Sequence, residues 1–584
     1  MRIVLLWLVF LITFNGAAQG LKVHNKSIVD KNGKEVILRG IGLGGWMLQE
    51  PYMLQLSGAA STQQAIKSKI RELIGDDRTE QFYTAWLQNH CTRGDIDSLA
   101  AWGFNSVRLP MHFNLFTLPA DEEPVKGQNT WLPTGFALTD SLLRWCASNK
   151  IYLILDLHAA PGGQGNDIAI ADRDSTKPFL WQTDNFNKTI ALWEKLAARY
   201  VNEEWLGAYD LVNEPNFGFQ NAADKNGCAE NENAPLKQLY VNLTKAIRKV
   251  DQKHMIIVEG NCWGNNYNGI FPLWDNNLVV SFHKYWNFTD QASIQKFLDI
   301  REKYNVPVWC GETGENSNVW FTDAVELFES NKIGWAMWPL KKMGINNMLQ
   351  VKTNTGYQKL VDYWRGKGGK PSANEAYQSL VQLASDAHVS KNLVHKDVID
   401  ALIRQVSTTK VVPSKKHLLQ PSAIIFAVDY DLGRNGYAYA DKDTGNYWVS
   451  TTKRTDWNKG RMYRNDGVDI NECKDSLSNG YAVSSIEDGE WLQYTVMNEK
   501  EGSFNINIRS SAKSDTGKLQ LLVNGKIVAD RLLPDTKNDQ VWQTSTLKNI
   551  RFRKGFNTIR VVALKGGFQL NYLQFVSTTS RAKE

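Results

Sequence analysis

The chain has 584 residues, which is too long for one ordinary domain and predicts two or three. With 42% hydrophobic and 22% charged residues, the composition is that of a folded protein and not of a disordered one. The net charge of +6 is small for this length, and no basic stripe with interleaved aromatic residues is present, which argues against nucleic-acid binding.

The first 19 residues predict a secretory signal peptide. Arg2 is followed by an apolar run over 3–14 and then by the small residues Gly16, Ala17 and Ala18, which suit cleavage. The run is too short for a comfortable membrane span, and no later segment offers about 18 consecutive apolar residues. We therefore expect a secreted protein, extracellular or periplasmic, that has no membrane span and is a monomer. Its six scattered cysteines leave disulfides and buried free thiols as open alternatives.

Between about residues 22 and 370, short apolar runs alternate with longer amphipathic stretches. The runs predicted as strands are 37–43, 104–110, 152–158, 208–214, 255–260, 278–285, 306–312 and 334–340. Several are almost purely apolar, as expected for parallel strands buried on both faces. Eight such β/α units predict an α/β fold, the (β/α)8 TIM barrel. The alternative, an open doubly wound sheet, lacks a glycine-rich phosphate fingerprint after the first strand.

The texture of the sequence changes near residue 410. We assign residues 20–408 to the barrel domain, including a polar helical segment over 372–407. Residues 409–422 contain two prolines and several basic residues and are predicted to be a linker. Short alternating segments over 423–577 predict an all-β sandwich of the jelly-roll type, with a hairpin turn at Asn524-Gly525.

Polar residues at the carboxyl-terminal tips of barrel strands face the active site. Glu214 ends the predicted fourth strand and Glu312 ends the seventh. Two carboxyl groups on opposite sides of a central cleft meet the requirement for cleaving a glycosidic bond, because one protonates the leaving oxygen while the other attacks the anomeric carbon. The pair therefore predicts a glycoside hydrolase.

Three further residues at the predicted strand ends would support these two catalytic roles. Arg108, at the end of the second strand, is the available cation that would keep Glu312 ionised. Asn213 stands beside Glu214 and can bind the 2-hydroxyl of the sugar, a contact that strengthens in the transition state. Tyr285 can donate a hydrogen bond to the nucleophile.

The remaining tips are aromatic or imidazole side chains. His158 and His283 can hold sugar hydroxyls or orient the acid/base. Trp338 offers a floor for the sugar ring, although a strand tryptophan is also common in cores.

Seven segments stand in order at these tips: LRGIGLGGW, VRLP, LDLHAAPGGQG, LVNEPN, HKYW, WCGETG and WAMWPLKK. Together they resemble glycoside hydrolase family 5, the large family that contains cellulases, over essentially all of residues 22–370. The resemblance implies retaining hydrolysis with Glu214 as acid/base and Glu312 as nucleophile, and no metal or organic cofactor. None of the eight characteristic residues is substituted, which argues against a vestigial barrel.

The resemblance leaves the substrate open. RGIGLGGWMLQEP and LDLHAAPGGQG are similar to the branch of the family that acts on β-1,3-glucans, so a β-1,3-glucan or mixed β-glucan is favoured. An endo-β-1,4-glucanase (cellulase), a mannanase and a non-catalytic glycan-binding protein remain alternatives. Action on esters or amides is disfavoured because no G-x-S-x-G or H-E-x-x-H motif is present. Endo or exo action depends on the insertion over 166–182 and the loop over 217–234.

The carboxyl-terminal region carries the segments DGVDI, YAVSSIEDGEWLQYTV, VWQT and GGFQLNYLQF. They resemble carbohydrate-binding module family 6, whose members clamp a sugar between two rings and bind it through an asparagine. Trp542 and Asn571 match two of these positions, and packing within the sandwich is the alternative role for both. Ser484-Ser485 stands where the second ring is usual, so Tyr481 is the candidate substitute.

The same family often binds a structural calcium through an E-A-E segment on its first strand. Here the sequence reads Phe426-Ala427-Val428, and Gln574 replaces an acidic residue near the end. Because calcium needs several oxygen ligands, we expect no metal site in this module.

Overall fold

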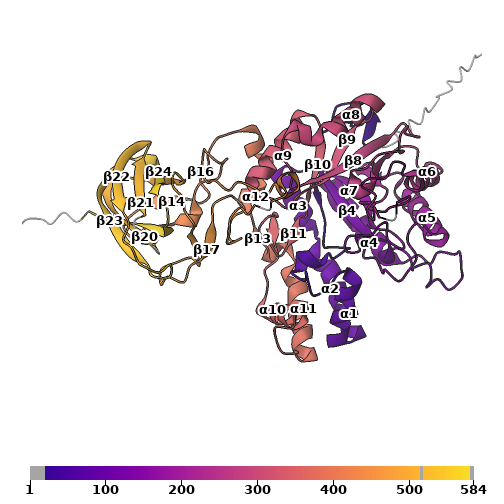
Figure 1. Ribbon diagram of the computed structural model, residues 1–584, viewed down its shortest axis with the longest axis horizontal. Helices are drawn as coiled ribbons and strands as arrows, with labels where there is room; N and C mark the ends of the chain where they lie inside the picture. The colour runs from indigo at the N-terminus through magenta and orange to yellow at the C-terminus, as the bar shows by residue number, and fades with distance from the viewer. Residues whose placement is uncertain (1–19, 222, 454, 513–516, 579–584) are drawn as a thin grey trace, which may run out of the picture.

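The computed structural model describes residues 20–578 apart from 222, 454 and 513–516. The predicted signal peptide lies outside these residues. A barrel domain and a β-sandwich lie side by side (Figure 1). Within the described part of the chain, none of the helices combines the length and apolar character needed to cross a bilayer.

Eight parallel strands close into a barrel, which confirms the predicted fold class. In chain order they are β3 (Arg39–Gly42), β4 (Ser106–His112), β5 (Tyr152–Ala159), β6 (Leu206–Asp210), β7 (Met255–Glu259), β8 (Leu278–Tyr285), β9 (Val308–Gly314) and β10 (Gly334–Trp338). Their side chains are buried on both faces, as the continuous apolar runs predict. Strand β6 ends at Asp210, so Glu214 lies in the following loop and not on the strand as expected, with a left-handed φ of 45°.

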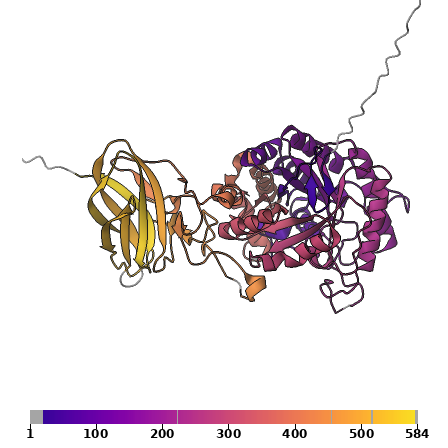
Figure 2. The ribbon, with the colours of Figure 1, turned by 90° about the horizontal axis from the view of Figure 1, so that it is seen from above.

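Helices surround the barrel (Figure 2). They are α3 (Arg93–Trp102), α4 (Pro133–Ser148), α5 (Thr183–Tyr200), α6 (Ala234–Arg248), the short α7 (Asn261–Gly264), α8 (Gln295–Tyr304), α9 (Asn318–Ser330) and α12 (Lys396–Ile403). Each longer helix buries one apolar face against the sheet; α5, for example, buries Leu192 and Leu196. The hairpin of β1 (Lys22–His24) and β2 (Ser27–Val29) precedes the barrel, and Leu21 packs into the cluster formed by alternate strand residues such as Trp309.

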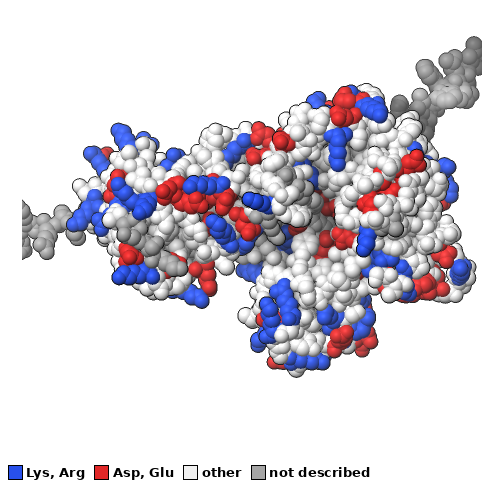
Figure 3. Space-filling model, in the orientation of Figure 1, with Lys and Arg blue, Asp and Glu red and all other residues white. Residues whose placement is uncertain are grey.

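Four helices form a lobe with a hydrophobic core of its own. They are α1 (Gln63–Ile74), α2 (Asp76–His90), α10 (Thr355–Trp364) and α11 (Ala373–Asp386). The first two follow β3 and the other two follow β10, so the lobe grows from the carboxyl ends of neighbouring strands. A small sheet of β11 (Lys341–Lys342), β12 (Leu349–Gln350) and β13 (Leu393–Val394) lies between β10 and α12 in the chain. Figure 3 shows a hollow on the visible face above the lobe, and acidic and basic side chains interspersed over the whole face.

The carboxyl-terminal domain is built from two sheets that share one core. Their strands are β14 (His417–Leu419), β15 (Ile424–Phe426), β16 (Tyr439–Ala440), β17 (Ile470–Glu472), β18 (Tyr481–Val483), β19 (Trp491–Asn498), β20 (Gly502–Ser511), β21 (Lys518–Val523), β22 (Lys526–Leu532), β23 (Gln543–Phe552), β24 (Gly555–Lys565) and β25 (Gln569–Ser577). Alternate residues of β21 are buried, as in a sandwich strand with one face in the core. Asn524 and Gly525 both have positive φ in the predicted hairpin turn.

The segment expected to be a linker is in part a strand. β14 lies within 409–422 and pairs with β19, and Val412 forms a bridge to Leu432. Prolines and basic residues are typical of flexible linkers. Here, however, β14 forms backbone hydrogen bonds with the edge of β19 that would otherwise be left unpaired.

Candidate active site

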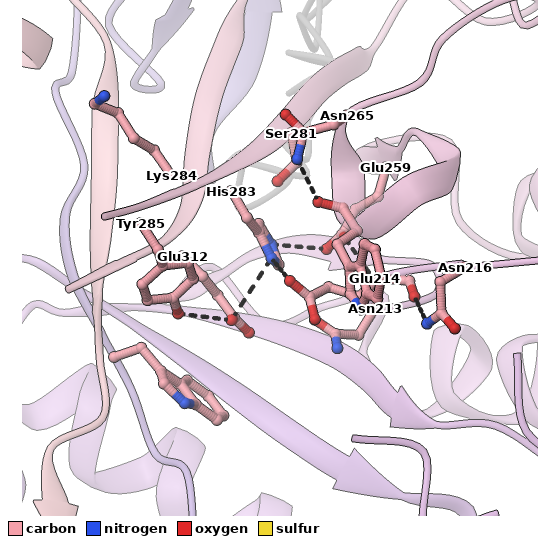
Figure 4. A network of polar contacts seen from close by, with 12 residues as sticks. Asn213, Glu214, Asn216, Glu259, Asn265, Ser281, His283, Lys284, Tyr285 and Glu312 are labelled. Carbon is pink, nitrogen blue, oxygen red and sulfur yellow. Dashed lines mark hydrogen bonds and ion pairs between the residues drawn. The ribbon is translucent and has the colours of Figure 1, made fainter. Parts of the chain in front are cut away.

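The two predicted catalytic carboxyl groups meet above the barrel. An oxygen of Glu214, an oxygen of Glu312 and a ring nitrogen of His283 all lie within 4.8 Å of one another (Figure 4). Glu214 is 8% exposed and Glu312 is 4% exposed, so both are recessed. Retaining glycosidases have carboxyl groups about 5 Å apart, whereas inverting enzymes leave about 6.5–9.5 Å for a water molecule. The spacing here is that of a retaining pair.

Glu312 is held by donors. Arg108 Nη1 donates to its Oε1, and the Tyr285 hydroxyl donates to its Oε2 at 3.0 Å. These two donors, one of them a guanidinium, fix the orientation of the Glu312 carboxyl group. This environment suits a nucleophile.

Glu214 lies in a different environment. Burial raises the pKa of Glu214, against the opposing effect of His283, and Glu312 and Glu259 raise this pKa further. His283 Nδ1 lies 2.7 Å from Glu214 Oε1, and the Glu214 backbone N–H donates to Glu259 Oε2 at 2.7 Å. A raised carboxyl pKa keeps the proton available at mildly acidic pH, which suits a general acid.

Arg108 lies at the centre of a buried ionic network. Besides Glu312 it contacts Asp156 at 3.1 Å and both Asp210 and Glu259 at 2.9 Å. Burial lowers the pKa of Arg108, but the carboxylates together raise it well above its usual value. Arg108 was predicted from the sequence, but its partners Asp156, Asp210 and Glu259 were not. Each is an acidic residue in an otherwise apolar strand, and this pattern could have identified them because a buried charge requires a partner.

Asn213 and His158 are fixed by the same network. Asn213 Oδ1 accepts from Arg108 Nη2 at 2.9 Å, and its Nδ2 donates to His158 Nε2 at 3.2 Å. His158 Nδ1 in turn donates to Asp156 Oδ2 at 2.7 Å, which sets the tautomer of the ring. The Asn213 amide is therefore held in one orientation beside Glu214.

Trp338 lies flat against His158, with ring centroids 5.1 Å apart and planes 4° from parallel. Its Nε1 donates to the Tyr52 hydroxyl at 3.0 Å. Two glycines of the LRGIGLGGW segment make room for the indole, because a Cβ on Gly42 would lie 2.4 Å from the Trp338 ring and a Cβ on Gly44 would lie 2.7 Å from it. The glycines of this segment are thus explained by the approach of one ring.

Glu50 is a further residue that the sequence analysis missed. It follows β3 and is buried. Burial raises the pKa of Glu50 well above its usual value, and the carboxyl groups of Glu312, Glu315 and Glu214 raise it further. In the sequence, the signal for Glu50 was an acidic residue in the segment that follows the first barrel strand.

The same catalytic cluster is the place where the described side chains could hold a metal ion, since Glu214, His283 and Glu312 converge there. Burial lowers the pKa of His283, but Glu259, Glu312 and Glu214 raise it well above its usual value. A protonated imidazole cannot ligate a metal, because ligation needs the neutral ring. Metal binding at this cluster would therefore require His283 to release its proton.

Loops after three neighbouring strands are joined around the site. In the insertion over 166–182, Asp172 accepts from the backbone of Gln64 at 2.7 Å, at the start of the lobe. Asn166 of the same insertion donates to the Lys225 carbonyl at 2.6 Å, in the loop over 217–234. That loop is linked by a disulfide between Cys228 and Cys262 to the segment after β7.

The other four cysteines, Cys91, Cys146, Cys310 and Cys473, are buried free thiols. Both alternatives that the sequence left open therefore occur in one chain.

The three residues predicted to bind sugar in the carbohydrate module have different surroundings in the structure. Trp542 is buried against Cys473. Asn571 is fully buried and donates to Asp475 Oδ2 at 3.0 Å. Tyr481 packs on Tyr463, with ring centroids 4.9 Å apart.

Two family models match the chain. Residues 67–344 match the model described as cellulase (glycosyl hydrolase family 5), and residues 464–575 match carbohydrate-binding module family 35. The expected assignment of the module to family 6 was therefore wrong. The missing ring at Ser484-Ser485 and the lost E-A-E segment were departures from the family 6 pattern. The longest segment that matched, YAVSSIEDGEWLQYTV, spans the two sandwich strands β18 and β19.

Among curated proteins, the chain is similar to a β-xylosidase of Phanerodontia chrysosporium, with 28% identity over 414 residues that cover 62% of this chain and 81% of the relative. It is also similar to a probable glucan 1,3-β-glucosidase A of Aspergillus niger, with 26% identity over 46% of this chain and 60% of the relative. An endoglucanase C of Acetivibrio thermocellus is 25% identical over 43% of this chain and 84% of the relative. The barrel domain belongs to glycoside hydrolase family 5, and the chain is a glycoside hydrolase with an attached carbohydrate-binding module.

Proposed function

We propose that the enzyme removes sugars from the ends of β-1,3-glucan or mixed β-glucan chains with retention of configuration. The observation that carries the reaction is the pair of recessed carboxyl groups, with oxygens within 4.8 Å and opposite environments. Burial raises the pKa of Glu214, whereas Glu312 accepts hydrogen bonds from Arg108 and Tyr285.

The reaction follows from these environments. Glu312 attacks the anomeric carbon while Glu214 gives its proton to the leaving oxygen, so the glycosidic bond breaks and a glycosyl–Glu312 ester forms. Glu214, now a carboxylate, takes a proton from a water molecule, which attacks the same carbon and releases Glu312. Two inversions at one carbon give net retention.

Four surrounding side chains would bind the sugar. The fixed amide of Asn213 lies beside the acid and suits the 2-hydroxyl, and Trp338 forms a floor beneath the ring. Tyr52 accepts from Trp338, and the catalytic carboxyl groups act electrostatically on Glu50, so both residues would offer oxygen atoms to sugar hydroxyls.

Contacts between the loops around the active site support cleavage at the ends of glucan chains. A groove for internal cleavage must be open at both ends. Here single contacts link the lobe to the insertion over 166–182, that insertion to the loop over 217–234, and that loop to the segment after β7. The similarity to the glucan 1,3-β-glucosidase supports the same assignment. Because the relatives include a β-xylosidase and an endoglucanase, β-xyloside cleavage and internal glucan cleavage are the alternatives to be tested.

The predicted signal peptide supports secretion, as does the disulfide, because disulfides persist in oxidising compartments. A polymeric substrate outside the cell would agree with both.

A product profile tests the proposal. Wild type and Glu312→Ala are incubated with laminarin, lichenan, a β-1,6-glucan, carboxymethylcellulose, glucomannan and an aryl β-xyloside. We expect glucose as the first product from laminarin, with wild type only. Equal activity of Glu312→Ala would refute the mechanism. Mixed oligosaccharides from carboxymethylcellulose would instead identify an endo-β-1,4-glucanase, and selective xylose release would identify a β-xylosidase.

A further inference from the structure

The two domains share a buried polar interface directly after the nucleophile strand. Asn316, four residues beyond Glu312, exchanges two hydrogen bonds with the Asn446 backbone of the module, at 2.8 and 2.9 Å. Asn465 Nδ2 donates to the Asn316 carbonyl at 2.8 Å and to Asn318 Oδ1 at 3.1 Å. All four asparagines are buried.

Carboxylates complete this interface. Asn318 Nδ2 donates to Asp397 of α12 at 2.8 Å and to Asp466 of the module at 3.0 Å. The Asn465 backbone N–H also donates to Asp397, at 2.8 Å. Buried polar groups of this kind are satisfied only while the domains stay docked, so the module has one orientation on the barrel (Figures 1 and 2).

This orientation brings an aromatic segment of the module against the loop that follows β8. Tyr447 packs against Phe288 of the barrel domain, with ring centroids 5.4 Å apart. Trp448 begins the short helix α13 (Trp448–Thr451) and is 49% exposed, and Phe288 is 45% exposed. Phe288 belongs to the loop that follows β8, the strand that ends at Tyr285.

The loop carrying Phe288 is well anchored. Lys284 Nζ donates to the Phe288 carbonyl at 2.6 Å, and Trp320 Nε1 donates to the Asn287 carbonyl at 2.8 Å. Trp286 lies between Tyr285 and Phe288 in the chain, and its ring centroid is 5.6 Å from that of Tyr285. Aromatic side chains thus lead from the nucleophile's hydrogen-bond donor outward to the module.

We propose that Trp448 of the module and Phe288 of the barrel domain form one platform that binds the part of the glucan chain outside the catalytic pocket. Flat C–H faces of sugars stack on exposed aromatic rings, and Trp448 directly follows Tyr447, the residue whose ring contacts Phe288. This inference rests on the proposed function, because a chain cut at its end leaves the remaining polymer as the leaving group. The module then takes part in substrate binding at the active site itself.

The platform predicts an effect that depends on chain length. Trp448→Ala and Phe288→Ala are compared with wild type on laminarin, on laminari-oligosaccharides of increasing length and on an aryl β-glucoside. Phe556→Ala is the matched control. Phe556 is 62% exposed and lies on β24, where it pairs with Met497 near the end of β19, whereas β16 pairs with the first residues of β19. Loss of a stacked ring should raise KM for long chains about three- to tenfold, with kcat for the aryl glucoside unchanged.

Binding measurements test the platform separately from the proposed catalytic function. In the Glu312→Ala background, calorimetry with a long laminari-oligosaccharide and with laminaribiose should show that Trp448→Ala weakens binding of the long ligand alone. Equal affinities with and without Trp448, in an enzyme whose wild type hydrolyses laminarin, would refute the platform. A wild type that hydrolyses none of the β-glucans would refute the proposed function instead, and the platform with it. Weaker binding in Phe556→Ala as well would place the sugar elsewhere on the module and also overturn the inference.

Discussion

The two catalytic carboxyl groups share one site and differ in their partners. Glu312 accepts from Arg108 and from Tyr285, whereas Glu214 is paired with His283 and loses solvation by burial. Their different roles therefore follow from their neighbours and not from their chemistry.

The raised pKa of Glu214 predicts the pH dependence of activity. The wild-type rate should fall as pH rises through this raised pKa, because the acid then loses its proton. In Glu214→Gln this alkaline limb should disappear, and kcat/KM on substrates with poor leaving groups should fall by about 10²–10⁴-fold. The measurement is a pH profile on an alkyl and on a dinitrophenyl β-glucoside.

The dinitrophenyl substrate is the control, because its leaving group needs little protonation and should lose much less rate. An unchanged alkaline limb in Glu214→Gln would assign the titration to another group.

The Arg108 network predicts a structural role beside the catalytic one. A lysine at this position is a single point charge and cannot satisfy the carboxylates that the guanidinium bridges. Arg108→Lys should lower the free energy of unfolding by about 3–5 kcal/mol. Denaturant unfolding checks this value, with Arg39→Lys as the control, since Arg39 pairs with Glu329 near the surface. Equal effects of the two variants would show that the buried network adds no stability.

Among elements, the end of β3 and the loop after it show how local sequence shapes the site. Gly42 and Gly44 leave space that Trp338 fills, and Trp338 in turn stacks on His158. In the sequence these glycines are only part of a family pattern. The physical reason for them is the close approach of the Trp338 ring, which lies about 300 residues further along the chain.

Gly42→Ala should therefore disturb the site without straining the backbone. The added Cβ would lie 2.4 Å from the Trp338 ring, so the indole must move. We expect a loss of about 1–3 kcal/mol in stability and a rise in KM. Thermal unfolding and steady-state kinetics measure both, with Gly369→Ala as control because nothing lies within 4 Å of a Cβ there. Unchanged kinetics in Gly42→Ala would show that Trp338 does not position the sugar.

The strands were predictable from sequence and the lobe was not. Buried parallel strands such as 152–158 are short apolar runs with polar tips, and that pattern is local. The lobe joins α1 and α2 to α10 and α11, which lie nearly 300 residues apart in the chain, and the disulfide joins loops without periodicity. Contacts of this kind depend on the closed barrel, so a single sequence carries no local signal for them.

At the scale of the molecule, the module is docked and not tethered. Asn465 donates to both Asn316 and Asn318, and β14 lies where a linker was expected. The sequence indicated two domains through the change of texture near residue 410. It could not indicate their contact, because the asparagines involved look like surface loop residues until both domains are folded.

The docked interface predicts coupled unfolding. Wild type should unfold in one calorimetric transition, since buried polar groups on each domain are satisfied by the other. Asn465→Ala leaves partners unsatisfied, which costs about 1–3 kcal/mol, and should separate the transition into two. Gln520→Ala, at an exposed pair with Asp530, is the control and should behave as wild type. Two transitions in wild type would contradict the docked arrangement.

The central claim is retaining hydrolysis by Glu214 and Glu312, and the anomer first released tests it most directly. Proton NMR during early hydrolysis of a laminari-oligosaccharide resolves the α and β anomers before they equilibrate. The spacing of the two carboxyl groups, with one oxygen of each within 4.8 Å, predicts that the β anomer appears first and the α anomer follows by mutarotation. Initial release of the α anomer would require a water molecule between the two groups and would contradict the mechanism.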